Sequence, residues 1–199
     1  MLKENIFVYI LIVFIILVCY QIYRTTPYFH LKCIISSKNG NTYCVREREI
    51  SKDAVELLAK IDDKCNKLID YISKVHPNNE DVKRLKENYK DVKIQEILPT
   101  STLTAYTENK GAKIAFCLNK NDKQTKTNRL IEEDVLFFVA MHELGHVMSK
   151  SVGHNEEFWS NFKFILQEAK NANMYQPVDY SKEPESYCGM EINSNPYFN

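Results

Sequence analysis

The spacing of hydrophobic and polar positions predicts that helices make up most of the chain. Apolar residues recur at every third or fourth position over residues 51–76, and Pro77 ends this pattern, which predicts one long helix. A shorter amphipathic helix is expected over residues 80–89. Another is expected over residues 156–172, with Asn155 as its N-cap. The helical periods therefore account for much of the chain after residue 50.

Residues 101–118 have a different, strand-like pattern. Two runs in which apolar and polar side chains alternate flank the turn signal Glu-Asn-Lys-Gly at residues 108–111, which predicts a β-hairpin. The tail from Met174 is rich in proline and is expected to be irregular. Helices combined with a small hairpin predict an α+β fold for residues 51–199.

The N-terminal part of the chain is apolar on every face. Residues 6–23 contain no charged side chain, and about 18 helical residues just cross a hydrocarbon core of about 30 Å. A cleaved signal peptide fits less well, because Gln-Ile-Tyr-Arg follows where small residues are required. The sequence therefore predicts a transmembrane helix as a membrane anchor (residues 1–24). A juxtamembrane stalk follows (residues 25–50), with a small hairpin around Asn39-Gly40.

The distribution of basic residues predicts the orientation of this single-pass anchor. Lys3 and Glu4 nearly cancel on its N-terminal side. Three basic residues follow on the other side, namely Arg24, Lys32 and Lys38. By the positive-inside rule, the C-terminal domain is therefore expected in the cytosol.

Composition argues against a strongly charged partner. The chain has 26 basic and 26 acidic residues, so its overall charge predicts binding neither to nucleic acid nor to an acidic partner. The six cysteines show no obvious framework spacing, which favours free thiols in a reducing compartment. Cys33 and Cys44 flank the Asn39-Gly40 turn, and the sequence leaves open whether they pair.

Candidate chemistry lies in an apolar helical run at residues 135–146, which contains the motif His-Glu-Leu-Gly-His. Residues four apart share one face of a helix, so the imidazoles of His142 and His146 can converge on one metal ion. Burying these polar groups among apolar side chains is costly unless a partner compensates. Glu143 then lies beside the metal, where its carboxylate can take a proton from a bound water. The expected cofactor is Zn2+.

A catalytic zinc site usually has three protein ligands and one open position. His154 is the best third ligand, because Gly153 permits the chain to reverse after the helix and the histidine follows directly. Acidic alternatives are Glu156, Glu157 and Glu168. The first two fit better as first-turn carboxylates favoured by a helix dipole, and the third as a solvated residue. A chance match to the motif, with both histidines simply hydrogen-bonded, is the alternative to a metal site.

Three blocks of sequence carry a family resemblance. They are T-A-Y-T-E-N-K-G-A-K-I-A-F-C-L (104–118), V-A-M-H-E-L-G-H-V-M-S (139–149) and G-H-N-E-E-F-W (153–159). Together they resemble the WLM family of zinc metallopeptidases, which are relatives of the SprT-like proteases among the zincins. The Tyr-Cys-Gly near the C-terminus and the apolar N-terminus resemble versions carried by large DNA viruses. The resemblance covers about residues 98–190, although the gap between His146 and His154 is longer than in cellular members.

The resemblance implies a zincin-like metallopeptidase domain, placed here over residues 51–199. In such a domain a peptide substrate pairs with the edge strand of a small sheet beside the cleft, and residues 113–118 are expected to supply that strand. The predicted function is a membrane-anchored, zinc-dependent metalloendopeptidase acting on proteins or peptides, with Glu143 as general base. If the protein is viral, its membrane is that of the host or the virion.

The sequence leaves other parts of the mechanism open. The donor that stabilises the oxyanion could be any of four tyrosines: Tyr106, Tyr175, Tyr180 and Tyr187. WLM relatives act on proteins crosslinked to DNA, but the chain shows no basic patch that predicts this substrate class. The alternative function is a structural membrane protein, for instance of the virion, whose zinc site only stabilises the fold.

Overall fold

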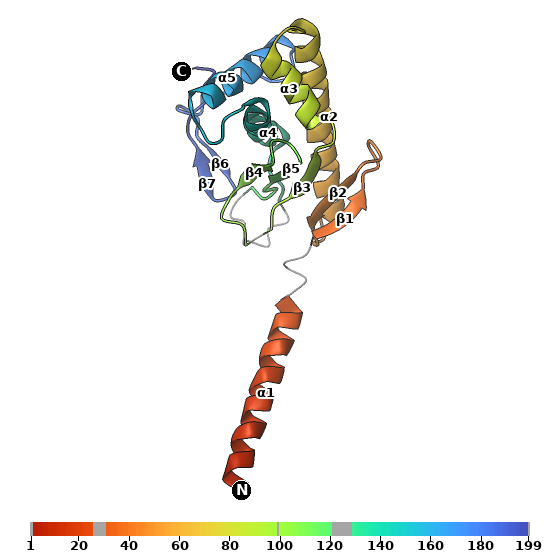
Figure 1. Ribbon diagram of the computed structural model, residues 1–199, viewed down its shortest axis with the longest axis vertical. Helices are drawn as coiled ribbons and strands as arrows, with labels where there is room; N and C mark the ends of the chain where they lie inside the picture. The colour runs from red at the N-terminus through yellow and green to blue at the C-terminus, as the bar shows by residue number, and fades with distance from the viewer. Residues whose placement is uncertain (1, 26–30, 99, 121–128, 199) are drawn as a thin grey trace.

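The computed structural model describes residues 2–25, 31–98, 100–120 and 129–198, with side chains from residue 6 to 22 in the first helix. The helices of this part of the chain are α1 (Leu2–Thr25), α2 (Ser51–Val75), α3 (Glu80–Tyr89), α4 (Glu133–Met148) and α5 (Glu156–Asn171). Its strands are β1 (Leu31–Ile35), β2 (Thr42–Arg46), β3 (Lys93–Glu96), β4 (Ala105–Glu108), β5 (Lys113–Phe116), β6 (Glu185–Tyr187) and β7 (Met190–Ile192). The predicted α+β class is confirmed, and Figure 1 shows the elements.

The helices of the body lie where the apolar periods predict them. Helix α2 ends at Val75, just before Pro77, whose ring cannot continue a helix. Helix α3 has Asn79 as its N-cap, and the side-chain oxygen accepts a hydrogen bond from the backbone N–H of Asp81 at 2.9 Å. Both helices bury one face, so their apolar stripes are core positions.

Within the described residues, the main sheet has five strands in the order β1-β2-β3-β5-β4. Strands β3 and β5 are parallel, whereas β4 is antiparallel to β5, as the predicted hairpin requires. Among the described strands, β4 is therefore an edge, and it lies against α4. The prediction that residues 113–118 supply the edge strand is wrong, because β5 is paired with β3 on one side and with β4 on the other.

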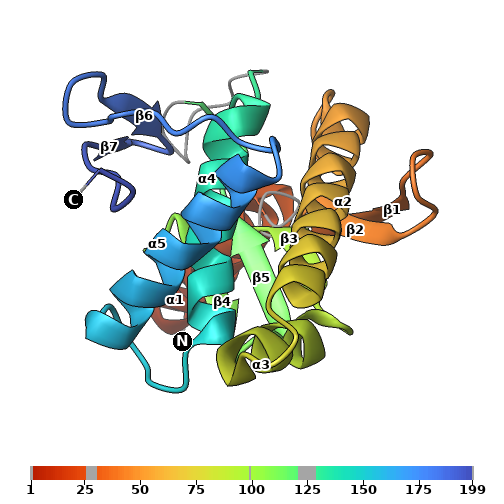
Figure 2. The ribbon, with the colours of Figure 1, turned by 90° about the horizontal axis from the view of Figure 1, so that it is seen from above.

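Helix α4 is the most enclosed helix of the body. Its buried residues point in every direction around the axis, and it contacts α2, α3, α5 and β4. Figure 2 shows α4 with α5 on one side and α2 on the other. A helix that is apolar all round is stable only when other elements cover every face. The two motif histidines are thus held by the most constrained element of the fold.

Residues 31–46, which were expected in a stalk, extend the sheet. Strands β1 and β2 form an antiparallel hairpin around Asn39-Gly40, and β2 continues the sheet through a parallel bridge to β3. Cys33 and Cys44 lie directly opposite each other across β1 and β2, with Cα atoms 3.9 Å apart, and form a disulfide. The free-thiol interpretation is wrong for this pair, because strand pairing brings the two side chains together.

The C-terminal tail, expected to be irregular, contains a further hairpin made of β6 and β7. Cys188 and Gly189 turn the chain between the strands with positive φ angles of 54° and 79°, which suit a two-residue hairpin turn. Cys188 also forms a disulfide with Cys117, although the two cysteines are 71 residues apart in sequence. The prediction of an irregular tail is wrong because its three prolines lie outside these two short strands.

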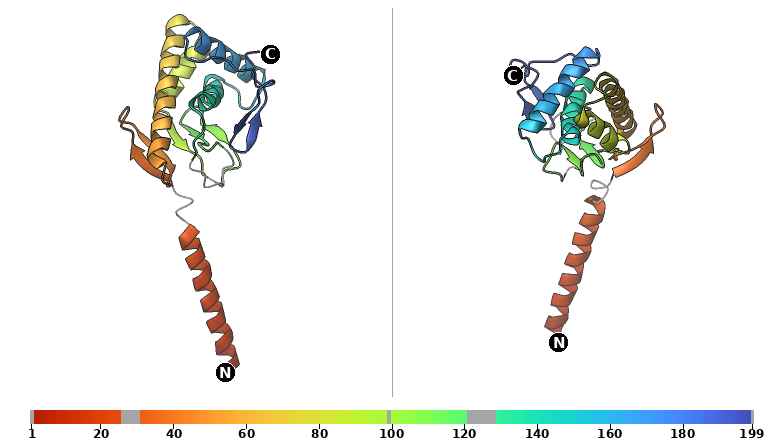
Figure 3. Two further views of the ribbon diagram at one scale, coloured as in Figure 1. Left: turned by 180° about the vertical axis from the view of Figure 1, so that it is seen from behind. Right: turned by 45° about the horizontal axis from the view of Figure 1, so that its top comes forward.

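Helix α1 extends away from the body, as both views in Figure 3 show. Its described side chains, residues 6–22, are all exposed. Among the described residues no helix is long and apolar enough to cross a membrane. The finding contradicts the predicted membrane anchor and the predicted single-pass membrane location.

Candidate active site

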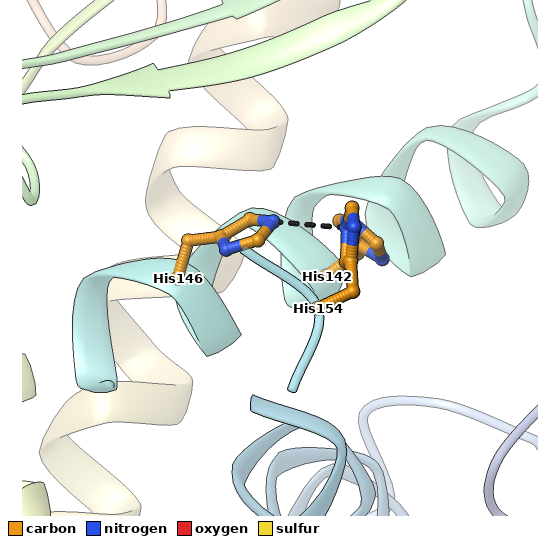
Figure 4. A group of neighbouring side chains, drawn as sticks. All are labelled: His142, His146 and His154. Carbon is orange, nitrogen blue, oxygen red and sulfur yellow. Dashed lines mark hydrogen bonds between the residues drawn. The ribbon is translucent and has the colours of Figure 1, made fainter. Parts of the chain in front are cut away.

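Three histidines converge at one point on the surface of α4. His142 and His146 lie one turn apart on that helix, and His154 approaches them from the loop that joins α4 to α5 (Figure 4). The Nε2 atom of His154 lies 3.0 Å from Nε2 of His142 and 3.2 Å from Nε2 of His146. The structure therefore brings together the three side chains that the sequence singles out.

The spacing of these nitrogens fits a single metal ion. Zinc bonds histidine nitrogen at about 2.0–2.1 Å in tetrahedral geometry, which places neighbouring ligand nitrogens about 3.3 Å apart. The two measured separations are close to this value, and the three ligand atoms all lie within 4.8 Å of one another. At most one proton can be shared between any two of these nitrogens, so a cation at their centre is the partner that satisfies all three.

The surroundings keep two of the histidines neutral. Burial, with smaller effects from the other two imidazoles, lowers the pKa of His142 to about 3. Burial and the neighbouring His154 and Lys110 lower the pKa of His146 to about 4. At neutral pH both rings therefore present a lone pair, which is the form that binds a metal.

Glu143 lies beside the three histidines but outside the group that could hold a metal. Its side chain is 3% exposed, and its Oε2 atom accepts a hydrogen bond of 2.7 Å from Oγ1 of Thr107 on strand β4. Burial raises the pKa of this carboxyl to about 7, while the bond from Thr107 opposes the rise. The carboxylate is thus fixed in one orientation at the boundary between α4 and the edge strand.

Helix α5 packs closely on α4 beside the histidines. A Cβ atom on Gly145 would lie 3.0 Å from a ring carbon of Phe158 and 3.3 Å from Cβ of Phe162, so only glycine permits this approach. The Phe158 ring stacks on His146, with centroids 4.2 Å apart and planes 26° apart. Phe158 thereby fixes the orientation of the His146 imidazole.

The loop carrying His154 is held by a carboxylate from α5. Glu157 accepts hydrogen bonds from the backbone N–H groups of Lys150 and Ser151, at 2.8 and 3.0 Å, and from the Ser151 hydroxyl. These bonds, led by the one from the Ser151 side chain, lower the pKa of Glu157 to about 2. Gly153 has a φ of 88°, so the glycine makes the reversal that places His154 over the helix.

The acidic alternatives for the third ligand occupy other positions. Glu156 and Glu157 lie in the first turn of α5, after the N-cap Asn155. Glu168 is 7% exposed and lies 3.3 Å from Nε2 of His76, so the interpretation of a solvated residue is wrong. Among the described residues, none of these carboxylates belongs to the histidine group.

A cavity of about 980 Å³ opens beside His142, Glu143 and His154. Of the four tyrosines considered for the oxyanion, only Tyr187 lines it among the described residues. Its hydroxyl donates a hydrogen bond of 3.2 Å to the backbone carbonyl of Thr104. The geometry therefore ties Tyr187 to the residue before β4 and assigns it no role toward an oxyanion.

The sequence did not predict two features of the site. Thr107 contacts Glu143 from a different element, and only the strand alternation of residues 101–107 could have placed it toward the helix. The hairpin β6–β7 lines the cavity from the end of the chain, and the Cys-Gly pair at its turn is the one local signal for it.

Comparisons with known proteins find relatives by sequence in large DNA viruses. No model of a known family matches the sequence. The chain is 27% identical over 164 residues to uncharacterized protein R325 of Acanthamoeba polyphaga mimivirus, covering 80% of this chain and 81% of that protein. It is 32% identical over 71 residues to uncharacterized protein 136R of Invertebrate iridescent virus 6, covering 36% of this chain and 38% of that protein.

Solved structures with a similar arrangement are those of Wss1. The crystal structure of Wss1 from Saccharomyces cerevisiae gives a TM-score of 0.45 at 18% identity, covering 65% of this chain and 89% of that one. A Wss1 mutant from the same yeast gives 0.46 at 15% identity, covering 66% and 92%. The relatives found by sequence are proteins of large DNA viruses, as the resemblance predicts. Because both TM-scores are below 0.5, residue roles in this chain rest on its own geometry.

Proposed function

We propose that this chain is a zinc-dependent metalloendopeptidase. The observation that carries the proposal is the convergence of three histidine Nε2 atoms, 3.0 and 3.2 Å apart, beside a cavity that also holds the buried carboxylate of Glu143. A site that only stabilised the fold would have no use for a buried carboxylate outside the ligand group. The combination of three ligands, one free carboxylate and a cavity fits hydrolysis.

His142, His146 and His154 would hold the metal. When bound, zinc would lower the pKa of a coordinated water to about 7 and polarise the carbonyl of the scissile bond. Phe158 and the Glu157-bound loop keep the three imidazoles in place, so little rearrangement is needed for binding.

Glu143 is the general base in this proposal. Its carboxylate accepts the proton of the attacking water and passes it to the nitrogen of the leaving amine. The hydrogen bond from Thr107 occupies Oε2, which leaves Oε1 to make this transfer. Because this hydrogen bond prevents the Glu143 carboxylate from rotating freely, the proton acceptor is already oriented before the substrate binds.

Strand β4 would bind the substrate backbone. It is the edge of the sheet among the described strands, it lies against α4, and its Thr107 contacts Glu143. An extended peptide pairing with β4 would pass the histidine group, with its main-chain groups bonded to the edge. This role belongs to β4 in place of the inner strand β5.

The test compares wild type with Glu143→Gln on an unfolded protein substrate such as reduced casein. We expect Glu143→Gln to retain about one zinc per chain and to lose at least about 10²-fold in turnover, since it keeps the shape but not the basicity. Glu87→Gln, on the exposed side of α3, is the matched control and should cleave like wild type. A zinc-loaded wild type without peptidase activity would favour the structural alternative.

A further inference from the structure

The cavity beside the histidines has three walls from distant parts of the sequence. One wall is the segment 101–105, which leads into β4. The second comes from α4 and α5 and includes Phe138, Trp159 and Phe162. The third is the C-terminal hairpin, over residues 187–192. Only the second wall belongs to the helix pair that carries the metal site.

Large apolar side chains are exposed on all three walls. Leu103 is 53% exposed, Trp159 43% and Met190 48%. A single exposed apolar side chain is ordinary on a protein surface, but several gathered around one concavity indicate a binding site for an apolar group. In this cavity they surround the space that adjoins His142 and Glu143.

The charged side chains on the walls are all acidic or imidazole. Glu143 and Glu191 line the cavity, and its described lining contains neither lysine nor arginine. A carboxylate side chain entering from a ligand would lose water without meeting a basic side chain, which is costly. An apolar side chain would lose only water and would gain contact with Leu103, Trp159 and Met190.

The hairpin wall is fixed in position. Its turn residue Cys188 is bonded to Cys117, which directly follows β5. Thr104 forms two further links to the hairpin, because its carbonyl accepts from the Tyr187 hydroxyl and its own hydroxyl contacts Sδ of Met190 at 3.1 Å. Met190 is therefore held beside the start of the proposed substrate-binding strand, and the pocket is formed before a ligand enters.

We propose that this cavity is a specificity pocket that accepts a large apolar side chain of the bound peptide and rejects an acidic one, with Leu103 and Met190 as the residues that determine the choice. The inference deepens the proposed peptidase function and rests on it. The substrates it selects are unfolded or extended segments that present leucine, methionine or phenylalanine next to the scissile bond.

The only tryptophan of the chain, Trp159, lines this cavity and reports its occupancy. The experiment titrates the full-length, zinc-loaded Glu143→Gln protein with blocked hexapeptides of glycine and alanine. Leucine, phenylalanine or aspartate is placed at each position in turn, and tryptophan fluorescence gives the Kd. We expect one position at which leucine and phenylalanine bind at least about tenfold tighter than aspartate. Equal Kd values at every position, or no fluorescence change with any peptide, would overturn the pocket.

A charge placed on the hairpin distinguishes binding in this pocket from general affinity for apolar peptides. Met190→Lys adds a cation to a cavity lined by carboxylates, so aspartate peptides should gain affinity and leucine peptides should lose it. Ile35→Lys places the same charge on an exposed side chain of the distant strand β1 and should leave both affinities unchanged. Unaltered preference in Met190→Lys would overturn the role of the hairpin. Because these measurements require no turnover, they distinguish a failed pocket from a failed peptidase, which the casein assay detects.

Discussion

The two sides of the proposed substrate cavity are built by different means. On one side, α4 and α5 carry the histidines and are fixed by close packing, with no space for a Cβ atom on Gly145. On the other side, the hairpin β6–β7 has three residues in each strand and is fixed by a disulfide and two side-chain contacts. The proposed chemistry therefore lies in the core, whereas the proposed selectivity lies on a tethered surface element.

The first prediction concerns the loss of the disulfide that holds the hairpin β6–β7. In the double variant Cys117→Ser and Cys188→Ser, the unfolded chain gains freedom that a bridge over 71 residues removes, which costs about 4 kcal/mol in the chain-entropy account. Urea unfolding should show this loss of stability. The preference for leucine over aspartate peptides should weaken, while zinc content stays near one per chain because the histidines are on the other side.

The matched control removes the other disulfide. Cys33→Ser with Cys44→Ser opens a bridge over only 11 residues, far from the cavity, and should cost about 3 kcal/mol while peptide preference is retained. Loss of zinc in the Cys117→Ser and Cys188→Ser variant would show that the two sides of the cavity are not independent.

The second prediction disturbs the packed side. Gly145→Ala places a methyl group 3.0 Å from the Phe158 ring, and such overpacking costs about 1–3 kcal/mol. Because Phe158 stacks on His146, the shift should also weaken zinc binding, measured by competition with a chromogenic chelator. Ser160→Ala, on the exposed side of α5, should change neither quantity. Unchanged zinc affinity in a destabilised Gly145→Ala protein would show that the packing of Phe158 does not affect metal binding.

The third prediction concerns the contact between the two main elements of the site. Thr107→Val keeps the shape of the side chain but removes its 2.7 Å hydrogen bond to Glu143. We expect kcat to fall about tenfold, equivalent to about 1.4 kcal/mol, with KM and zinc content unchanged, because only the orientation of the base is lost. Thr107→Ser retains the hydroxyl and should restore kcat. Equal losses in both variants would indicate a packing role for Thr107.

The sequence predicts those parts of the fold whose signals are local and repeated. Helices α2, α3 and α5 follow from apolar periods sustained over ten or more residues, α4 follows from an apolar run, and the hairpin β4–β5 follows from alternation around a turn. The motif spacing and Gly153 likewise suffice to nominate His142, His146 and His154. These features depend on residues close together in sequence, so a single chain contains the information for them.

The remaining features depend on contacts between distant segments. Strand β3 has no hairpin turn to a neighbour, because its partners β2 and β5 are parallel to it. The Cys117–Cys188 bridge and the Thr107 contact require the tertiary approach of elements 71 and 36 residues apart. The choice of β5 as the edge failed for the same reason, since strand order is decided by pairing across the sheet and not by the hairpin alone.

The smallest expected effect concerns the loop that joins the two helices of the packed side. Hydrogen bonds from Ser151 and Lys150 hold the pKa of Glu157 at about 2, below its ordinary value of 4.5. A carboxyl with a depressed pKa contributes stability above pH 4.5, and this contribution is lost as the pH falls toward 2. Metal-free Glu157→Gln should therefore lose less stability over that interval than metal-free wild type does. Circular dichroism measures the stability of both proteins. At pH 7 the variant should lose less than about 1 kcal/mol, because the carboxylate is partly exposed. The control is Glu156→Gln, at the exposed residue before Glu157, and it should follow the wild-type curve. Identical curves for all three proteins would show that the Glu157 carboxylate does not stabilise the loop.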